Sequence, residues 1–190
     1  NNIDIPVEDI DTKELLESVE RLEKIANYII ANHDKKTHRK KFTAIFCVSS
    51  VDTLIKYYEI FKTKKEAGQH NLRIATIFSY AANENDKDAN DLVADAFGGM
   101  FNQAAEPTVA YNKNSHSREK LDTFIEDYNK MYNTRFSTKD SQTYYNYYKD
   151  IAKRIKEREK ESFQDKNRVD ILLVVNMFLT GFDAKKANTL

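Results

Sequence analysis

Two short polar segments that directly follow apolar runs carry the side chains best suited to chemistry. The first is Ser49-Ser50, and the second runs from Thr180 through Gly181 to Asp183. Hydroxyls together with free backbone N–H groups at the start of a helix can bind a phosphate, and a hydroxyl, a glycine and a carboxylate in quick succession form a candidate ligand site. The same residues suit structural roles, because serine caps helices and Gly181 can supply a turn with Asp183 as the next cap. From spacing alone, a turn is the favoured interpretation of the Gly181 loop.

The apolar runs before these segments predict strands of a parallel sheet. Residues Ile171 to Val175 form an unbroken run of branched side chains, which fits a strand buried on both faces. Phe42 to Val48 is a second largely apolar run, and Leu72 to Phe78 is a third. Between these two, Ser49-Ser50 precedes an amphipathic helix that runs to about Lys64, which gives a strand–helix–strand crossover of the parallel type. Because open α/β sheets bind ligands at the carboxyl ends of their strands, both polar segments lie where a ligand is expected.

Three further segments have the three- and four-residue spacing of apolar side chains that predicts amphipathic helices. They span Asp11 to His33, Arg118 to Tyr132 and Tyr144 to Arg158, and Asp11 with Glu14 resembles a capping box at the start of the first. The tyrosines from Tyr132 to Tyr148 could stack on nucleic-acid bases. Their helical spacing favours a place in the core instead.

The remaining stretches divide a single domain, residues 1–190, into smaller parts. Residues 1–41 are a helical lead-in whose basic end, His33 to Lys41, could contact phosphate but is typical of a solvated connector. Residues 79–117 are largely polar and begin with an acidic stretch, so we expect an inserted segment that is partly irregular and partly helical. Residues 118–165 form a helical segment before the last strand, and we predict that the mixed-charge stretch Lys153 to Arg168 is a solvated helix end.

Composition narrows the classes of function. The 30 Lys and Arg balance 30 Asp and Glu, so any contact with nucleic acid or membrane must be local. The single cysteine, Cys47, cannot form an internal disulfide and indicates a reducing, cytoplasmic compartment, and no apolar stretch is long enough to span a bilayer. The chain has no phosphate-binding loop, no acidic pair at a strand end, no nucleophile elbow, no Cys/His cluster for a metal and no glycine-rich dinucleotide turn. We therefore expect no catalysis by this chain alone.

The sequences of these motifs, and their order along the chain, resemble those of one known family. The string from Ile171 to Leu190, which contains Val-Val-Asn-Met-Phe-Leu-Thr-Gly-Phe-Asp, resembles motif V of the motor (R) subunit of type I restriction-modification enzymes. Phe42 to Ser50 resembles motif IV of the same family, and Leu72 to Glu84 resembles its next strand. Ile125 to Tyr132 and Tyr147 to Arg154 resemble its lead-in to motif V. The resemblance covers about Phe42 to Leu190 in order.

The resemblance implies the second RecA-like lobe of a superfamily 2 helicase-type translocase, a three-layer α/β/α sandwich with a mostly parallel sheet. It implies that Ser49 and Ser50 contact the DNA backbone, that Thr180 and Gly181 approach DNA or nucleotide, and that Asp183 couples to the ATP site. Ala187 stands where leucine is common in motif V, which affects packing. The implied ligands of the parent subunit are ATP and Mg²⁺, and its implied partners are duplex DNA and the methyltransferase (M) and specificity (S) subunits in the cytoplasm.

The resemblance also predicts what this chain lacks. The parent would be an ATP-dependent type I site-specific deoxyribonuclease, but its phosphate-binding loop, acidic motif, arginine-bearing motif VI and nuclease belong to other regions. Because the chain begins at Asn1 without methionine and stops at Leu190 just after motif V, we expect it to be part of a longer protein. On its own it is predicted to be inactive, with no ATP or Mg²⁺ bound. The alternative is a non-catalytic α/β protein-interaction domain in which the Gly181 loop is structural.

Overall fold

The computed structural model describes residues 18–78, 113–139, 141–175 and 187–189. In chain order the elements are α2 (Val19–Lys36), β1 (Thr43–Val48), α3 (Val51–Glu66), β2 (Ile74–Ile77), α5 (Lys113–Tyr132), α6 (Ser141–Lys156), the 3₁₀ turns η1 (Glu157–Glu159) and η2 (Asp165–Asn167), β3 (Ile171–Val175) and β4 (Ala187–Thr189). The capping box predicted at Asp11 and Glu14, most of the insertion 79–117, and Thr180, Gly181 and Asp183 lie outside the described residues.

The described strands form one sheet in the order β2-β3-β1-β4, and every neighbouring pair is parallel. The prediction of an α/β fold with a parallel sheet is therefore confirmed. The register aligns Ala44 with Ile171 and Val48 with Val175, so β1 and β3 are matched along their length. The last long strand, β3, lies between the two strands of the predicted crossover. Strand β4 has only three residues, too few for an apolar period, and was not predicted.

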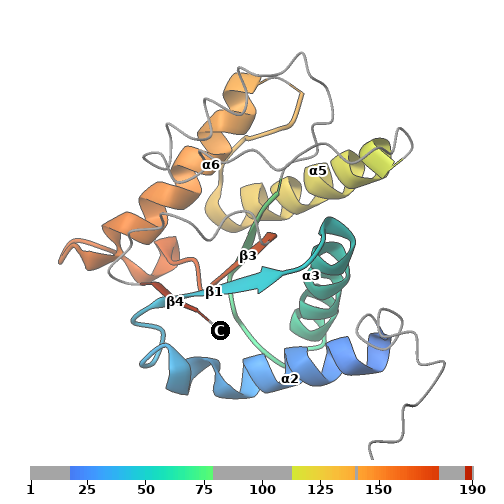
Figure 1. Ribbon diagram of the computed structural model, residues 1–190. Helices are drawn as coiled ribbons and strands as arrows, with labels where there is room; N and C mark the ends of the chain where they lie inside the picture. The colour runs from blue at the N-terminus through green and yellow to red at the C-terminus, as the bar shows by residue number, and fades with distance from the viewer. Residues whose placement is uncertain (1–17, 79–112, 140, 176–186, 190) are drawn as a thin grey trace, which may run out of the picture.

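Helices cover both faces of this sheet. The connection from β1 to β2 runs through α3, and the connection from β2 back to β3 runs through α5 and α6, so the two crossovers travel in opposite directions across the strands. Because parallel crossovers are right-handed, opposite directions place their helices on opposite faces. Figure 1 shows α2 and α3 toward the bottom and right of the strands, and α5 and α6 toward the top.

Aromatic side chains join the layers. Phe46 of β1 packs edge-on against Tyr57 of α3, with ring centroids 4.8 Å apart. Tyr58 of α3 stacks on Phe124 of α5 at 3.9 Å, which closes the two layers around the edge strand β2. Tyr147 of α6 is also buried, with its ring centroid 5.0 Å from that of Tyr128 of α5. Buried aromatic side chains each contribute about 2–3 kcal/mol of hydrophobic free energy, so the tyrosine-rich helices act as core, as their spacing predicted.

Two stretches predicted to be solvated contain buried residues. Within the stretch Lys153 to Arg168, the side chain of Arg158 is almost completely buried, and within the basic run His33 to Lys41, His33 and Thr37 are buried. These predictions were wrong at those positions because the polar groups find partners at the amino ends of the strands, as described below. Charge patterns alone do not reveal such tertiary partners.

Candidate functional site at the carboxyl edge of the sheet

The strand register places both predicted site segments at one edge of the sheet. Val48 and Val175 are Cα partners at the carboxyl ends of β1 and β3. Neighbouring strands lie about 4.8 Å apart, so the chain leaves β1 into Ser49-Ser50 and leaves β3 toward Thr180 from adjacent positions. Ligand sites of parallel sheets form at this edge. The structure thus brings the exits of the two segments together, while Thr180, Gly181 and Asp183 themselves lie outside the described residues.

Ser50 acts as the N-cap of α3. Its backbone is extended, with φ −150° and ψ 161°, and its Oγ accepts a hydrogen bond from the backbone N–H of Thr53 at 3.1 Å. The same oxygen lies 2.9 Å from Oγ1 of Thr53. These contacts satisfy one of the free N–H groups of the first helical turn. The structural role considered for Ser50 is therefore confirmed.

Ser49 differs from its neighbour. It is exposed at a bend directly after β1, and its hydroxyl has no hydrogen bond to any residue in the described part of the chain. Asp52 in the first turn of α3 already places a negative charge at the positive end of the helix dipole. Because the hydroxyl of Ser50 is used in the cap, Ser49 is the better placed of the two serines to bind a ligand.

Three tyrosines of α6 hold the carboxyl end of the edge strand β2. The hydroxyl of Tyr147 donates to the carbonyl oxygen of Thr76 at 2.8 Å, and the hydroxyls of Tyr144 and Tyr148 lie 2.8 and 3.0 Å from the carbonyl oxygen of Phe78. Burial raises the pKa of Tyr147, so its hydroxyl stays protonated as a donor. The spacing of these tyrosines predicted that they lie in the core, but it did not predict their hydroxyl contacts. The acceptors are backbone carbonyl oxygens, which every residue has, so no side-chain pattern indicates them.

Cys47 contributes packing at this edge. It lies one residue before the end of β1, opposite Val174 of β3. Burial raises the pKa of its thiol, which disfavours the reactive thiolate. The described part of the carboxyl edge therefore offers hydroxyl and backbone groups for binding rather than a nucleophile.

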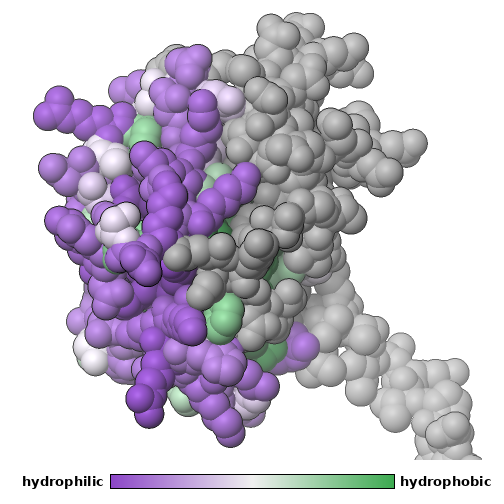
Figure 2. All heavy atoms as spheres, turned by 90° about the vertical axis from the view of Figure 1, so that its left-hand side faces the viewer, coloured by the Kyte–Doolittle hydropathy of each residue, from purple (hydrophilic) through white to green (hydrophobic). Residues whose placement is uncertain are grey.

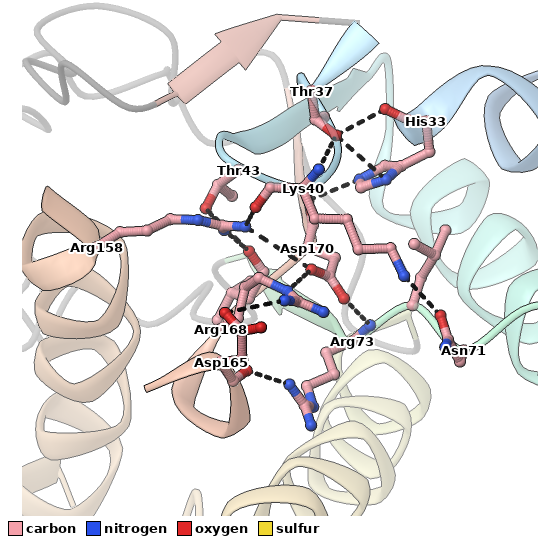
Figure 3. Close-up of polar contacts among 12 residues, drawn as sticks. His33, Thr37, Lys40, Thr43, Asn71, Arg73, Arg158, Asp165, Arg168 and Asp170 are labelled. Carbon is pink, nitrogen blue, oxygen red and sulfur yellow. Dashed lines mark hydrogen bonds and ion pairs between the residues drawn. The ribbon is translucent and has the colours of Figure 1, made fainter. Parts of the chain in front are cut away.

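The opposite, amino edge of the sheet contains a buried polar network centred on Asp170 (Figure 3). Its carboxylate is fully buried and lies 2.5 Å from Nε of Arg168, and its other oxygen accepts the backbone N–H of Arg73 at 2.9 Å. The Arg158 guanidinium lies 3.9 Å from the same carboxylate. The carboxylate of Asp170 thus links the starts of β2 and β3 to the segment that follows α6.

Arg158 extends this network to the start of β1. Its Nη1 lies 2.6 Å from both Oγ1 of Thr43 and the carbonyl oxygen of Val169, and its Nη2 donates to the carbonyl oxygen of Lys40. Burial lowers the pKa of Arg158 to about 10, while the charge of Asp170 opposes that shift. The guanidinium therefore remains charged at neutral pH and is used as a structural donor.

His33 belongs to the same network. Its Nε2 lies 3.2 Å from the carbonyl oxygen of Asp170, and its own carbonyl oxygen accepts from Oγ1 of Thr37 at 2.7 Å. In the described ranges, no group of three His, Cys, Asp or Glu side chains could hold a metal ion. The amino edge is thus organised by hydrogen bonds and charge pairs.

A separate pocket of about 380 Å³ lies between α3 and α5 near the start of β2. Its walls include apolar side chains such as Phe61, Leu72 and Met131, and an ion pair of 2.6 Å between Lys62 and Asp127. It is at the other end of β2 from the two candidate segments. It does not form part of the candidate site.

Comparisons with known proteins identify relatives of one kind. A family model described as "T1R_D3-like: Type I restriction enzyme subunit R domain 3" matches residues 40–190. The type I restriction enzyme SauCOLORF180P endonuclease subunit of Staphylococcus aureus (strain COL) is 42% identical over 184 residues, which cover 97% of this chain and 17% of the relative. The SsaAORF53P endonuclease subunit of Staphylococcus saprophyticus is 41% identical, with the same coverage. The chain therefore spans about a sixth of the length of these relatives. No helix in the described residues has the length and apolar character to cross a membrane.

Proposed function

Because the chain belongs to the type I restriction enzyme R subunit family, we propose that it is the second RecA-like lobe of that subunit's DNA translocase. In this proposal the parent subunit uses ATP to move duplex DNA before cleaving it, and it works in the cytoplasm with the methyltransferase and specificity subunits. The lobe contributes motif IV, which ends at Ser49-Ser50, and motif V, which contains Thr180 to Asp183, to the ATP cleft and the DNA track.

The observation that carries this proposal is the alignment of Val48 with Val175 on adjacent parallel strands. Two motifs far apart in the sequence leave the sheet side by side, at the edge where parallel sheets bind ligands. A motor lobe needs such a juxtaposition because one side of its cleft must respond to nucleotide and DNA together. A turn-forming role for the Gly181 loop would not require Ser49 to be exposed at the neighbouring strand.

Each residue has a role suited to its chemistry. Ser49 offers a free hydroxyl to the DNA backbone, and Ser50 presents the start of α3 while its own hydroxyl caps that helix. Thr180 supplies a second hydroxyl, and Gly181 allows the backbone to approach a ligand closely. Asp183 supplies a carboxylate that couples the loop to the ATP and Mg²⁺ held in the parent subunit.

This chain by itself is expected to hydrolyse no ATP and cleave no DNA. Phosphoryl transfer needs a phosphate-binding loop, a metal-holding carboxylate and an arginine around one nucleotide, and the chain has no such loop. A coupled ATPase assay on the purified chain, with and without duplex DNA, checks this expectation. DNA-stimulated hydrolysis above the buffer rate would contradict it.

Substitutions in motif V of the full-length subunit test the proposed function. Asp183→Ala and Gly181→Ala should each lower DNA-stimulated ATP turnover and translocation about a hundredfold, because small displacements of a catalytic constellation have effects of that size. Lys139→Ala, an exposed position after α5, is the matched control and should retain both activities. If both motif V variants keep wild-type turnover and translocation, the motif V assignment is wrong, and the alternative of a non-catalytic α/β protein-interaction domain is favoured.

A further inference from the structure

The turn between α2 and β1 has an unusual backbone. His38, Arg39 and Lys40 have φ values of 51°, 58° and 63°, so three consecutive residues other than glycine are left-handed. This conformation costs about 1–2 kcal/mol per residue. Such strain persists only where the surrounding structure imposes it, and it concentrates at functional segments. The surrounding structure therefore imposes the conformation of this turn, which is not the solvated connector that its charge pattern indicated.

Buried residues of the amino-edge network form hydrogen bonds with the backbone of this turn. The carbonyl oxygen of Lys40 accepts a hydrogen bond from Arg158, and the backbone N–H of Lys40 donates to Oγ1 of Thr37 at 3.1 Å. The ammonium group of Lys40 lies 2.7 Å from Oδ1 of Asn71 (Figure 3). The side chains of Arg39 and Lys41, on either side of Lys40, are exposed.

The α6 helix carries a second row of cations, and the segment that follows this helix contacts the turn. Lys149, Lys153 and Lys156 are exposed and follow three- and four-residue spacing, so they share one face of the helix. The hydrogen bond from Arg158 to Lys40 joins the end of this row to the turn. We call the two rows together the basic ridge, and its exposed members are Lys35, Arg39, Lys41, Lys149, Lys153 and Lys156.

The ridge is strongly positive in a chain that is neutral overall. Residues 34–41 contain five Lys and Arg and one Asp, and residues 149–160 contain six Lys and Arg and three Asp and Glu, while the whole chain has net charge +0. Glu157 is already paired with Lys160 at 2.7 Å, and no described carboxylate forms an ion pair with Arg39, Lys41 or Lys156. Figure 1 shows the connection from α2 to β1 and the end of α6 on its left-hand side, and Figure 2 shows that the coloured part of this side is predominantly hydrophilic.

We propose that the basic ridge binds the phosphate backbone of duplex DNA, independently of sequence, as a contact separate from the carboxyl edge. Lysine and arginine side chains without acidic partners bind phosphates by releasing counterions. Single-stranded nucleic acid is instead bound by aromatic platforms, and Tyr144, Tyr147 and Tyr148 of α6 are turned into the core. The inference depends on the charges and the turn, and it does not require the proposed motor role.

Salt dependence of DNA binding tests the ridge in the full-length subunit. The probe is a duplex without a recognition site, measured by fluorescence anisotropy in the absence of ATP over a range of salt concentrations. The variants R39Q/K41Q and K153Q/K156Q each remove two charges, and glutamine keeps the side-chain length. Since each lost phosphate contact lowers the slope of log affinity against log salt by about 0.9, each variant should reduce the slope by about 1.8.

A matched control removes two lysines elsewhere. K24Q/K120Q takes one charge from α2 and one from α5, at positions that are paired with Glu20 and Glu59. Its slope should equal that of the unchanged protein. If the ridge variants also keep the unchanged slope, or if the control shows the same reduction, the proposal is overturned. A reduction that appears only with a single-stranded probe would overturn the assignment to duplex DNA. Normal ATP turnover by the motif V variants leaves this result unaffected, so the two proposals fail separately.

Discussion

At the amino edge of the sheet, Asp170 and Arg158 are buried and bonded to several partners, whereas at the carboxyl edge Ser49 is exposed after β1 with no hydrogen bond to the described residues. The same two strands, β1 and β3, supply both edges. Buried charges are costly when unpaired, so the charged groups of the amino edge must keep their partners. Their role is to hold the strands in register. The carboxyl edge keeps polar groups available, which is what a binding edge requires.

Among the substitutions that test this contrast, Asp170→Ala should have the largest effect on stability. Removal of the buried carboxylate takes away the buried acidic partner of Arg158 and leaves Arg168 with the exposed Asp165 alone. Loss of one member of a buried charge network costs about 3–5 kcal/mol. We expect a decrease of that size in the free energy of unfolding, measured by urea denaturation of the chain.

Asp165→Ala is the control for that experiment. Asp165 lies 3.3 Å from the same Arg168, but its side chain is 91% exposed. Exposed ion pairs contribute about 0–1 kcal/mol, so this variant should unfold almost as the original chain does. Equal losses from the two variants would show that burial of Asp170 is not what stabilises the amino edge.

The network around Asp170 also shows where sequence patterns stop being informative. The runs Phe42 to Val48 and Ile171 to Val175 predicted β1 and β3 because a largely continuous apolar run is typical of a strand buried on both faces. The burial of Arg158 was missed because its partner Thr43 lies 115 residues away and a mixed-charge stretch favours a solvated interpretation. The left-handed turn at Arg39 was missed for a similar reason, since its conformation is imposed by Arg158 and Thr37 and not by glycine. The predicted roles of Thr180, Gly181 and Asp183 remain predictions.

Tyr147→Phe tests the support that α6 gives to the carboxyl edge. The change removes only the hydroxyl and leaves the buried carbonyl oxygen of Thr76 without its donor. An unsatisfied buried acceptor costs about 1–3 kcal/mol, and the free energy of unfolding should fall by about 1.5 kcal/mol. Tyr145→Phe, at a half-buried position on the same helix, should have no measurable effect. A neutral Tyr147→Phe would mean that the end of β2 is held by packing alone.

The two serines after β1 separate stability from binding within one dipeptide. Ser50→Ala removes the cap of α3 and should cost about 1 kcal/mol of unfolding free energy. Ser49→Ala should leave that free energy unchanged and weaken DNA binding by the full-length subunit several-fold, because a neutral hydrogen bond contributes about 0.5–1.5 kcal/mol. Denaturation and anisotropy measured on both variants give the comparison. If Ser50→Ala instead weakens DNA binding and Ser49→Ala lowers the free energy of unfolding, the ligand contact is at Ser50.

The smallest expected effect is a dependence of stability on pH that belongs to the amino edge only. His70 precedes β2, its Nε2 lies 2.8 Å from the carbonyl oxygen of Phe61, and its Nδ1 accepts the backbone N–H of Leu72 at 3.1 Å. Acceptance by Nδ1 requires the neutral ring. Burial lowers the pKa of His70 below its usual value, so the unfolded chain binds a proton more readily than the folded chain. The stability contributed by neutral His70 is therefore complete above about pH 6.5 and is lost as the pH falls through the lower pKa of the folded state.

His70→Asn isolates this contribution, because the asparagine carbonyl oxygen can accept the Leu72 N–H at any pH. The difference in unfolding free energy between the original chain and the variant, measured by urea denaturation from pH 7 to pH 5, should shift in favour of the variant as the pH falls. Serine hydroxyls do not titrate in this range, so Ser49→Ala should leave the pH profile unchanged. If the difference in unfolding free energy between the original chain and His70→Asn does not change with pH, protonation of His70 does not affect the stability of the amino edge. The buried charge pairs would then be the feature that distinguishes the amino edge from the carboxyl edge.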